Sequence, residues 1–280
     1  MVIDQSRYAA FLKNPEYFRM RYMLDLDCKD ADRDSPNHHG RRRGTAFHIM
    51  SEEHHKASED AAIVTAVAKA VPNDREAVDK AVVMFGAYKK AVEGRYTKVA
   101  AEVPFCVPIP GSPHSMSGRV DGIVSDRAGK LWCEETKTAG RYAKLPNLKW
   151  EWSHNPQADF EIIGAKANGY DVAGVMVQTV VDAVPHPRVW PIEVLRTPQQ
   201  LAILQYNVHQ VCEIIRMLQD TFGVEKPWPH VPTTYNPCNT PGKCDFDGDC
   251  RKIDVPDGYL MREEHLELMT EKVWRSTKAA

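Results

Sequence analysis

Apolar residues recur along this chain with two different periods, and each period predicts one kind of secondary structure. Spacings of three and four, as at Val78, Val82 and Phe85, are typical of one face of a helix, and alternation is typical of a strand. We expect helices at about residues 6–22, 44–70, 73–94, 157–168 and 197–220, with the tail at 259–280 as a further candidate. We expect strands at about residues 99–109, 117–125, 131–136, 174–181 and 188–195, and an irregular loop at 24–39.

Two of these strands form a predicted β-hairpin. Residues 117–125 alternate in polarity, residues 127–130 (Arg-Ala-Gly-Lys) have the composition of a tight turn, and an apolar run resumes at Leu131. Strands joined by a tight turn pair antiparallel. The sequence therefore predicts that residues near the start of the first strand lie beside residues near the end of the second.

Charged residues stand at that end of the hairpin. Asp121 is on the first strand, whereas Glu135 and Lys137 are two positions apart on the second and share one face of the sheet. Two carboxylates beside one amine suit a hard divalent cation, Mg²⁺ or Mn²⁺, together with a group that activates water or neutralises a phosphate. Glu134 points to the opposite face and is not expected to be a ligand.

The alternative is a solvated sheet edge whose charges form cross-strand salt bridges. The apolar run Leu131-Trp132-Cys133 comes just before the charged triplet, and Ile123-Val124 follows Asp121. Charged residues flanked by core residues on strands favour a functional site over a solvated edge.

The composition narrows the class of protein. A chain of 280 residues with 43% hydrophobic content suits one α/β domain with a helical insertion, or two small lobes. Its seven cysteines do not fit a small secreted disulfide scaffold, and no apolar run has the length of a signal peptide or a membrane span. We therefore expect a cytoplasmic protein with no membrane partner. The net charge of -2 is not that of a protein that coats DNA non-specifically.

Local charge points to nucleic acid more strongly than the net charge does. The candidate nucleic-acid-binding residues are Arg41, Arg42 and Arg43 before one predicted helix, and Arg141, Lys144 and Lys149 after the charged triplet. Trp150 and Trp152 follow the second group, and cations beside aromatic rings suit a single-stranded nucleic-acid groove. The alternative is a solvated loop whose tryptophans belong to the core.

Several motifs follow one another in a set order. They are SRYAAFLKNPEYFRMRY from Ser6, GTAFH ending at His48, an acidic strand residue at Glu102, GRVD ending at Asp121, ETKT from Glu135, and a helix-opening Gln157. Together they resemble the PD-(D/E)xK nuclease superfamily in its RecB-like branch, over about residues 6–250. That branch includes nuclease domains of recombination helicases, RecB-like CRISPR-associated exonucleases and many phage exonucleases.

The resemblance implies an α/β fold with a restriction-endonuclease-like core, in which helices flank a mixed central sheet. An N-terminal helical lobe and a C-terminal cysteine-containing segment would complete it. The chain would then divide into a helical region at 1–98 that carries His48, a nuclease core at 99–225, and a cysteine loop and tail at 226–280.

The resemblance also implies roles for the site residues. Asp121, Glu135, the carbonyl of Thr136 and the imidazole of His48 would ligate Mg²⁺ or Mn²⁺, and an imidazole ligand favours Mn²⁺. Lys137 would position the attacking water or stabilise the pentacoordinate phosphate.

Three further assignments follow from the same resemblance. Gln157 would fix the scissile strand by hydrogen bonds, and Glu102 is a candidate metal ligand, with an exposed strand position as the alternative. For His48 the alternative is an ordinary surface histidine, since two more histidines follow a turn or two later. Its position after Gly44 favours the ligand.

The cysteines depart from the pattern of the relatives, which often hold an iron–sulfur cluster with one early cysteine and three late ones. Here Asn14 takes the early position, while Cys238, Cys244 and Cys250 form the late group. A [4Fe–4S] cluster normally takes four thiolates, and Cys28 could supply the fourth. Zinc held by the three cysteines with a His or Asp, and a site without metal, are the alternatives.

The sequence therefore predicts a metal-dependent DNA nuclease, acting as an exonuclease on DNA ends or single strands. The resemblance implies a place in recombination, repair, or phage or CRISPR DNA processing, in a bacterial cell or a phage-infected host, with a recombination or CRISPR partner protein. A non-catalytic DNA-end-binding module of the same fold and a structure-selective endonuclease are the alternatives.

Overall fold

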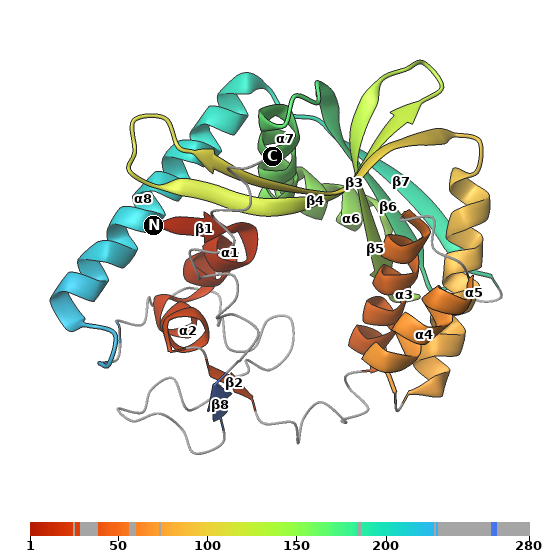
Figure 1. Ribbon diagram of the computed structural model, residues 1–280, viewed down its shortest axis with the longest axis horizontal. Coiled ribbons are helices and arrows are strands. Elements are labelled where there is room, and N and C mark those ends of the chain that lie inside the picture. Colours follow the sequence, from red (N-terminus) through yellow and green to blue (C-terminus); the bar gives the residue numbers. More distant parts are fainter. Residues whose placement is uncertain are drawn as a thin grey trace. The chain divides into compact units, whose positions relative to one another are not determined.

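The computed structural model describes residues 1–24, 26–28, 39–55, 60–72, 74–183, 186–226, 228 and 259–261 (Figure 1). These residues belong to two compact units. The first comprises residues 1–5 and 35–209, and the second comprises residues 6–34 and 210–280. The predicted division at residues 98 and 225 stays a prediction.

A six-stranded mixed sheet is the centre of the first unit. Its strands are β1 (Val2–Asp4), β3 (Tyr96–Pro108), β4 (Ser115–Asp126), β5 (Leu131–Ala139), β6 (Val172–Val181) and β7 (Arg188–Val194). The order is β1-β4-β5-β6-β7, and β3 pairs antiparallel with β4. The pairs β1–β4 and β5–β6 are parallel, whereas β4–β5 and β6–β7 are antiparallel. The predicted mixed α/β core with a central sheet flanked by helices is confirmed.

The predicted hairpin is β4–β5, with its turn at residues 127–130. Strand β5 pairs with residues 122–125 of β4, and the short β1 pairs with residues 115–117. Residues 118–121 of β4 therefore lie between these two partners. Asp121 occupies the last position of that interval, where β4 and β5 part.

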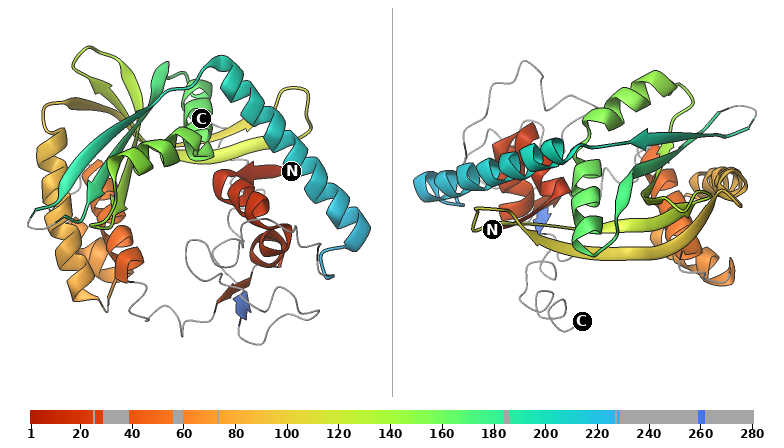
Figure 2. Two further views of the ribbon diagram at one scale, coloured as in Figure 1. Left: turned by 180° about the vertical axis from the view of Figure 1, so that it is seen from behind. Right: turned by 90° about the horizontal axis from the view of Figure 1, so that it is seen from above.

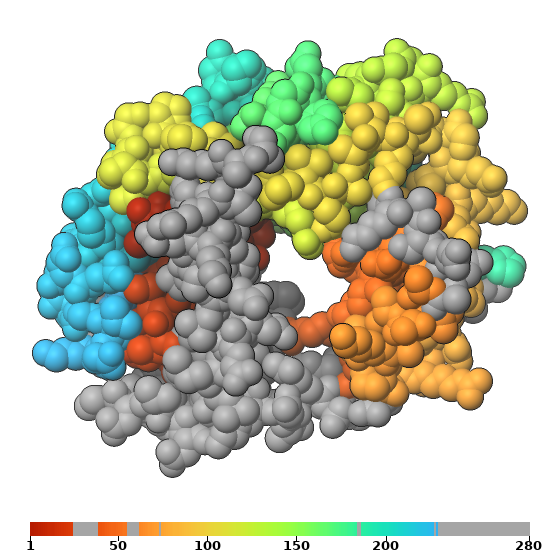
Figure 3. Space-filling model, in the orientation of Figure 1, coloured from red at the N-terminus to blue at the C-terminus, as the bar shows by residue number. Residues whose placement is uncertain are grey.

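Helices cover both faces of the sheet (Figures 1 and 2). One face carries α3 (His39–His55) and α5 (Arg75–Val92), with α4 (Asp60–Ala70) packed beside α3. The other face carries α7 (Pro156–Ala167), which contacts β3, β4, β5 and β6, whereas α6 (Leu145–His154) packs beside β7. In the space-filling view, α3 (orange) lies beside β3 (yellow) (Figure 3).

The single helix expected at 44–70 is two helices in the structure, and that prediction was wrong. A straight helix of 27 residues would be about 40 Å long, so its second half could not pack on its first. Here Ile63 and Val67 of α4 return to the core cluster that contains Phe47 and Met50 of α3. The predicted helix is divided in two because this lets the apolar side chains of both parts be buried together. The spacing of apolar residues along the chain does not reveal such a division.

Two other local predictions need correction. Residues 26–28, expected in a loop, form strand β2 (Leu26–Cys28), which pairs with β8 (Tyr259–Met261), so the start of the expected tail helix is a strand. The reason is tertiary pairing between segments more than 200 residues apart, which local pattern cannot reveal. Helix α6 was not predicted; it begins with Leu145-Pro146, and proline is well tolerated in a first turn.

Helix α7 approaches the sheet closely because glycine removes side chains on both sides of Phe105. A Cβ on Gly164 of α7 would lie 2.2 Å from Phe105 Cδ1, and one on Gly118 of β4 would lie 2.7 Å from its Cζ. The ring of Phe105 thus fills the space between helix and strand. This close packing fixes the N-terminal turn of α7, which carries Gln157.

The second unit contains α1 (Gln5–Lys13), α2 (Pro15–Phe18), the π-helix η1 (Arg19–Met23) and the end of α8 (Pro198–Phe222). Asn14 caps α2, since its Oδ1 accepts hydrogen bonds from the backbone of Glu16 (2.8 Å) and Tyr17 (3.4 Å). The fully buried carboxylate of Glu16 accepts two hydrogen bonds from Arg19 and one from the backbone of Trp228. Arg19 also donates to the carbonyl of Val224 at 2.7 Å. A buried charge network therefore joins α2 to the segment after α8.

Candidate active site

Asp121 and Glu135 stand where β4 and β5 separate. The pairing of the two strands ends at Gly122 and Glu134, so these carboxylates come one residue beyond the last pair. Glu135 is 1% exposed, and the side chain of Asp121 is 25% exposed. Burial and the negative charge of Glu135 raise the pKa of Asp121 to about 6. The structure thus brings together the two carboxylates of the sequence motif.

Lys137 reaches back to Glu135 along the same face of β5, as the alternation of side chains predicts. Its Nζ lies 2.6 Å from Glu135 Oε1. Burial alone would lower the pKa of Lys137, but the Glu135 carboxylate outweighs it and raises that pKa. The amine is therefore a fixed positive charge at the edge of the site, and 43% of its side chain is exposed.

Gln157 contacts the other carboxylate oxygen of Glu135, the one that Lys137 does not contact. Asn155 caps α7 by accepting a hydrogen bond from the Gln157 backbone at 2.9 Å, which places Gln157 in the first turn. The Gln157 Nε2 group donates to Glu135 Oε2 and to Glu161 Oε1, both at 2.8 Å. In this structure the side-chain amide of Gln157 therefore orients a carboxylate.

Glu161 is a site residue that sequence reasoning missed. It lies four positions after Gln157, on the same face of α7, and it is buried. Burial and the neighbouring charge of Glu135 raise the pKa of Glu161 well above its ordinary value. The Gln-x-x-x-Glu spacing on a helix directly after the charged strand was the signal that could have identified it.

His48 is on α3, which covers the face of the sheet opposite to α7. Its Nδ1 lies 3.9 Å from Asp121 Oδ2. Helix α3 approaches β5 closely at Gly44, where a Cβ would lie 3.3 Å from Thr138 Oγ1. His48 is one turn later on the same helix, and its ring lies beside Asp121. The spacing between Gly44 and His48 is thus explained by close packing followed by one turn of helix.

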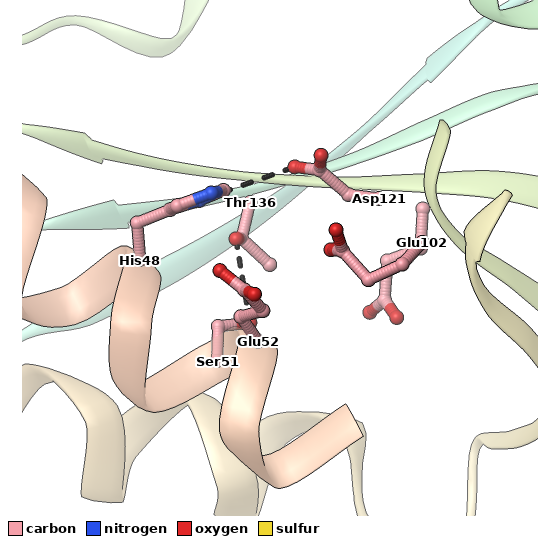
Figure 4. Close-up of a pocket in the computed structure, with 7 residues that line it drawn as sticks. His48, Ser51, Glu52, Glu102, Asp121 and Thr136 are labelled. Carbon is pink, nitrogen blue, oxygen red and sulfur yellow. Dashed lines mark hydrogen bonds and ion pairs between the residues drawn. The ribbon is translucent and has the colours of Figure 1, made fainter. Parts of the chain in front are cut away.

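A pocket opens between α3 and the strands beside His48 and Asp121 (Figure 4). It is lined by His48, Ser51, Glu52, Glu102, Asp121, Glu134 and Thr136. The hydroxyl of Thr136 donates to Ser51 Oγ at 3.4 Å, which joins β5 to α3. Carboxylates from one helix and three strands therefore surround a single small space.

Glu134 faces away from Glu135, as predicted, yet it belongs to this pocket. Its carboxylate accepts a hydrogen bond from the hydroxyl of Tyr88 at 3.0 Å, and both side chains are buried. Burial raises the pKa of Glu134 to about 7, against the hydrogen bond from Tyr88, which lowers it. The contact with α5 explains why a glutamate can occupy this core position.

Glu102 has an unusual backbone conformation. Its φ of 52° is the only positive value for a non-glycine residue in the part of the chain that the structure describes. Its carboxylate lines the pocket and lies 2.6 Å from Arg119 Nε, with 17% of the side chain exposed. A left-handed residue inside a strand is strained, and such strain accumulates at functional sites.

This strain gives a direct prediction for two variants that both remove the carboxylate. Glu102→Gly should be more stable than Glu102→Ala by about 1 kcal/mol, because only glycine adopts a positive φ without a steric penalty. Urea unfolding of the two variants measures the difference. In an ordinary strand position alanine is the more stable residue, so alanine equal to or above glycine would show that residue 102 is not left-handed in solution.

The basic residues named from the sequence fall into two groups. Arg42 pairs with Asp74 at 2.6 Å, and Arg43 pairs with Asp182. These two guanidinium groups hold helix α3 to its neighbours, and Arg41 is the exposed member of the triplet. Arg141, Lys144 and Lys149, in contrast, are all exposed on α6 and the turn before it.

The cysteine site lies outside the described residues. Cys238, Cys244 and Cys250 are beyond the described part of the chain, and for Cys28 only the backbone of β2 is described. The iron–sulfur or zinc site stays a prediction.

The donor set fits a divalent cation. Glu135 is buried and Asp121 partly buried, and the negative charge of Glu135 helps to raise the pKa of Asp121, a repulsion that a cation would relieve. The imidazole of His48 lies 3.9 Å from Asp121, and oxygen ligands with one nitrogen suit Mg²⁺ or Mn²⁺. The site can therefore hold a cation beside an amine, an arrangement that suits a negatively charged substrate.

Comparisons with known proteins agree with this chemistry. A family model described as the PD-(D/E)XK nuclease superfamily matches residues 3–251. A search of curated proteins finds no match. Among solved structures, one described as the crystal structure of SSO0001 is similar at 14% identity and a TM-score of 0.31. The match covers 63% of this chain and 76% of that one. Within the described residues, no helix is both long and apolar enough to span a membrane.

Proposed function

The chain belongs to the PD-(D/E)XK nuclease superfamily, and on that premise we propose that it is a metal-dependent deoxyribonuclease that acts as an exonuclease on DNA ends or single strands. The observation that carries the proposal is the convergence of Asp121, Glu135 and Lys137 at the fork of β4 and β5. A metal-binding pair of carboxylates with an adjacent amine is a working arrangement for phosphodiester hydrolysis.

The proposed metal ligands are the carboxylates of Asp121 and Glu135, the imidazole of His48 and the backbone carbonyl of Thr136, with Glu102 as a further candidate. A bound Mg²⁺ or Mn²⁺ would lower the pKa of a water molecule and polarise the phosphate. The close approach of Asp121 to both His48 and Glu135 supports this set.

Lys137 is proposed to place its ammonium group against the attacking water or the phosphate. Its ion pair with Glu135 keeps the amine protonated and restricts its position. A preorganised positive charge stabilises the negative charge that develops in the transition state.

Gln157 was predicted to fix the scissile strand. Its amide donates to Glu135 and Glu161, and we therefore propose that it orients the Glu135 carboxylate. We also propose the RecB-like branch, a role in recombination, repair, or phage or CRISPR DNA processing, and a protein partner in that process. These proposals rest on the order of the sequence motifs.

The deciding experiment compares an end-labelled linear single strand with a circular single strand of the same length, in Mg²⁺ and in Mn²⁺. Loss of the linear DNA alone is the expected result for an exonuclease. Cleavage of the circle would identify an endonuclease. Stable binding without cleavage of either DNA would identify a non-catalytic end-binding module.

The relative activity with Mn²⁺ and Mg²⁺ tests whether His48 is a metal ligand. Mn²⁺ should support more activity than Mg²⁺, because an imidazole ligand favours the softer ion. His48→Ala should narrow that gap by lowering the activity with Mn²⁺ more than the activity with Mg²⁺. The ratio of the two initial rates is the measurement, and His54→Ala, on the same helix, is the control. A ratio that His48→Ala leaves unchanged would remove this residue from the ligand set.

A further inference from the structure

Helix α6 is anchored to the first unit by one of its two tryptophans. Trp152 is 4% exposed, and its backbone carbonyl accepts a hydrogen bond from Arg196 Nη2 at 3.4 Å. Arg196 is itself held by Asp159 of α7, with an Nε–Oδ1 distance of 2.8 Å. The orientation of α6 is therefore fixed about its own axis.

That orientation turns the other tryptophan outward. Trp150 lies two residues before Trp152, about 200° around the helix, and it is 68% exposed. Its ring lies against that of His154 at a centroid distance of 4.7 Å and an interplanar angle of 37°, and His154 Nδ1 lies 2.8 Å from the Trp150 carbonyl. The indole ring thus contacts His154 and exposes most of its surface to solvent.

A second aromatic ring stands in the turn before α6. Tyr142 is 83% exposed, and the guanidinium carbon of Arg141 lies 5.1 Å from the centre of its ring. Between residues 140 and 154 the chain carries three cations, Arg141, Lys144 and Lys149, and one acid, Glu151. The exposed rings are therefore surrounded by net positive charge.

We define this surface by five residues: Arg141, Tyr142, Lys144, Lys149 and Trp150. Along the chain, it is connected to the proposed active site at both of its ends. Arg141 is four positions after Lys137 in the chain, a span of at most about 14 Å. At the other end, α6 leads through two residues to Gln157. Lys137 and Gln157 both contact Glu135, so a strand with a phosphate at Lys137 comes within reach of these rings.

We propose that this surface binds single-stranded DNA by stacking unpaired bases on Trp150 and Tyr142 while the three cations contact its phosphates. The inference rests on the proposed function and adds the form of the substrate. Large exposed aromatic rings mark interaction sites, and stacking on them is available to unpaired bases but not to bases inside a duplex. The cations select a polyanion over an apolar protein surface.

The test measures binding in metal-free buffer containing EDTA, where the wild-type chain cannot cleave by a metal-dependent route. Fluorescence anisotropy of a labelled oligo-dT and of a blunt duplex of equal length gives the two dissociation constants. Trp150→Ala should weaken binding to oligo-dT by at least fivefold and binding to the duplex by less than twofold. Tyr142→Ala should act in the same direction. Tyr206→Ala is the matched control, since Tyr206 is 61% exposed on α8.

Three results would overturn the proposal. Trp150→Ala could leave oligo-dT binding unchanged, or weaken both DNAs equally, as for a contact that does not read unpaired bases. It could also change the sedimentation of the free protein without changing DNA binding, which would make this surface an interface between copies of the chain. Because none of these measurements depends on cleavage, their outcome is separate from that of the nuclease assay.

Discussion

Lys137→Ala is expected to lower the rate of DNA cleavage at least a hundredfold while the protein stays folded. The ammonium group lies 2.6 Å from Glu135 and is held on the exposed side of the carboxylate pair. Loss of one preorganised positive group that stabilises transition-state charge typically costs about 10² to 10³ in rate. Asp121→Ala and Glu135→Ala should have a larger effect, because each removes a proposed metal ligand.

Single-turnover rates at saturating Mn²⁺ measure this effect, with circular dichroism and thermal unfolding as checks on folding. Lys166→Ala is the matched control, since Lys166 is an exposed lysine in the last turn of α7. If Lys137→Ala retained near-normal turnover at saturating metal, the assignment of the active site would be wrong.

Glu16→Ala is expected to destabilise the second unit by about 3–5 kcal/mol. Glu16 is fully buried and Arg19 nearly so, and removal of one partner leaves the other as an uncompensated buried charge. The backbone N–H of Trp228 would also lose its acceptor, which lies at 2.6 Å. The expected result is unfolding of this unit at lower urea concentration, together with faster proteolysis between α8 and the C-terminus.

The control uses an ion pair with the same spacing on the surface. Glu213 and Arg216 of α8 are also three residues apart and lie 2.6 Å from each other, with 63% of the Arg216 side chain exposed. Arg216→Ala should change stability by less than about 1 kcal/mol. A cost for Glu16→Ala no greater than that of Arg216→Ala would show that the buried network does not hold this unit together.

His48 and Gln157 were assigned from the family resemblance, whereas the placement of Asp121, Glu135 and Lys137 follows from local geometry. Alternation of side chains puts Glu135 and Lys137 on one face, and the tight turn brings β4 beside β5. Each of these depends on a few neighbouring residues, so a pattern along the chain is sufficient to find it.

The features that the sequence did not reveal depend on distant partners. Arg42 and Arg43 form ion pairs with Asp74 and Asp182, and the residues next to the arginines in the sequence do not indicate these partners. The burial of Glu161 depends on how α7 lies on the sheet. The positive φ of Glu102 occurs inside strand β3, where the sequence predicts ordinary extended backbone. Strand β2 likewise forms only because β8 pairs with it.

The packing of the Phe105 ring between Gly118 and Gly164 limits which positions of this protein can be engineered. Gly164 lies two turns along α7 from Gln157, and it has no contact with a reacting group, yet it sets how near the helix comes to the sheet. A Cβ at residue 164 would force the Phe105 ring or the helix to shift, and a shift of the helix would carry the Gln157 amide away from Glu135. A mutational library restricted to the lining of the pocket would omit this position, although its tolerance for change should be among the lowest in the chain.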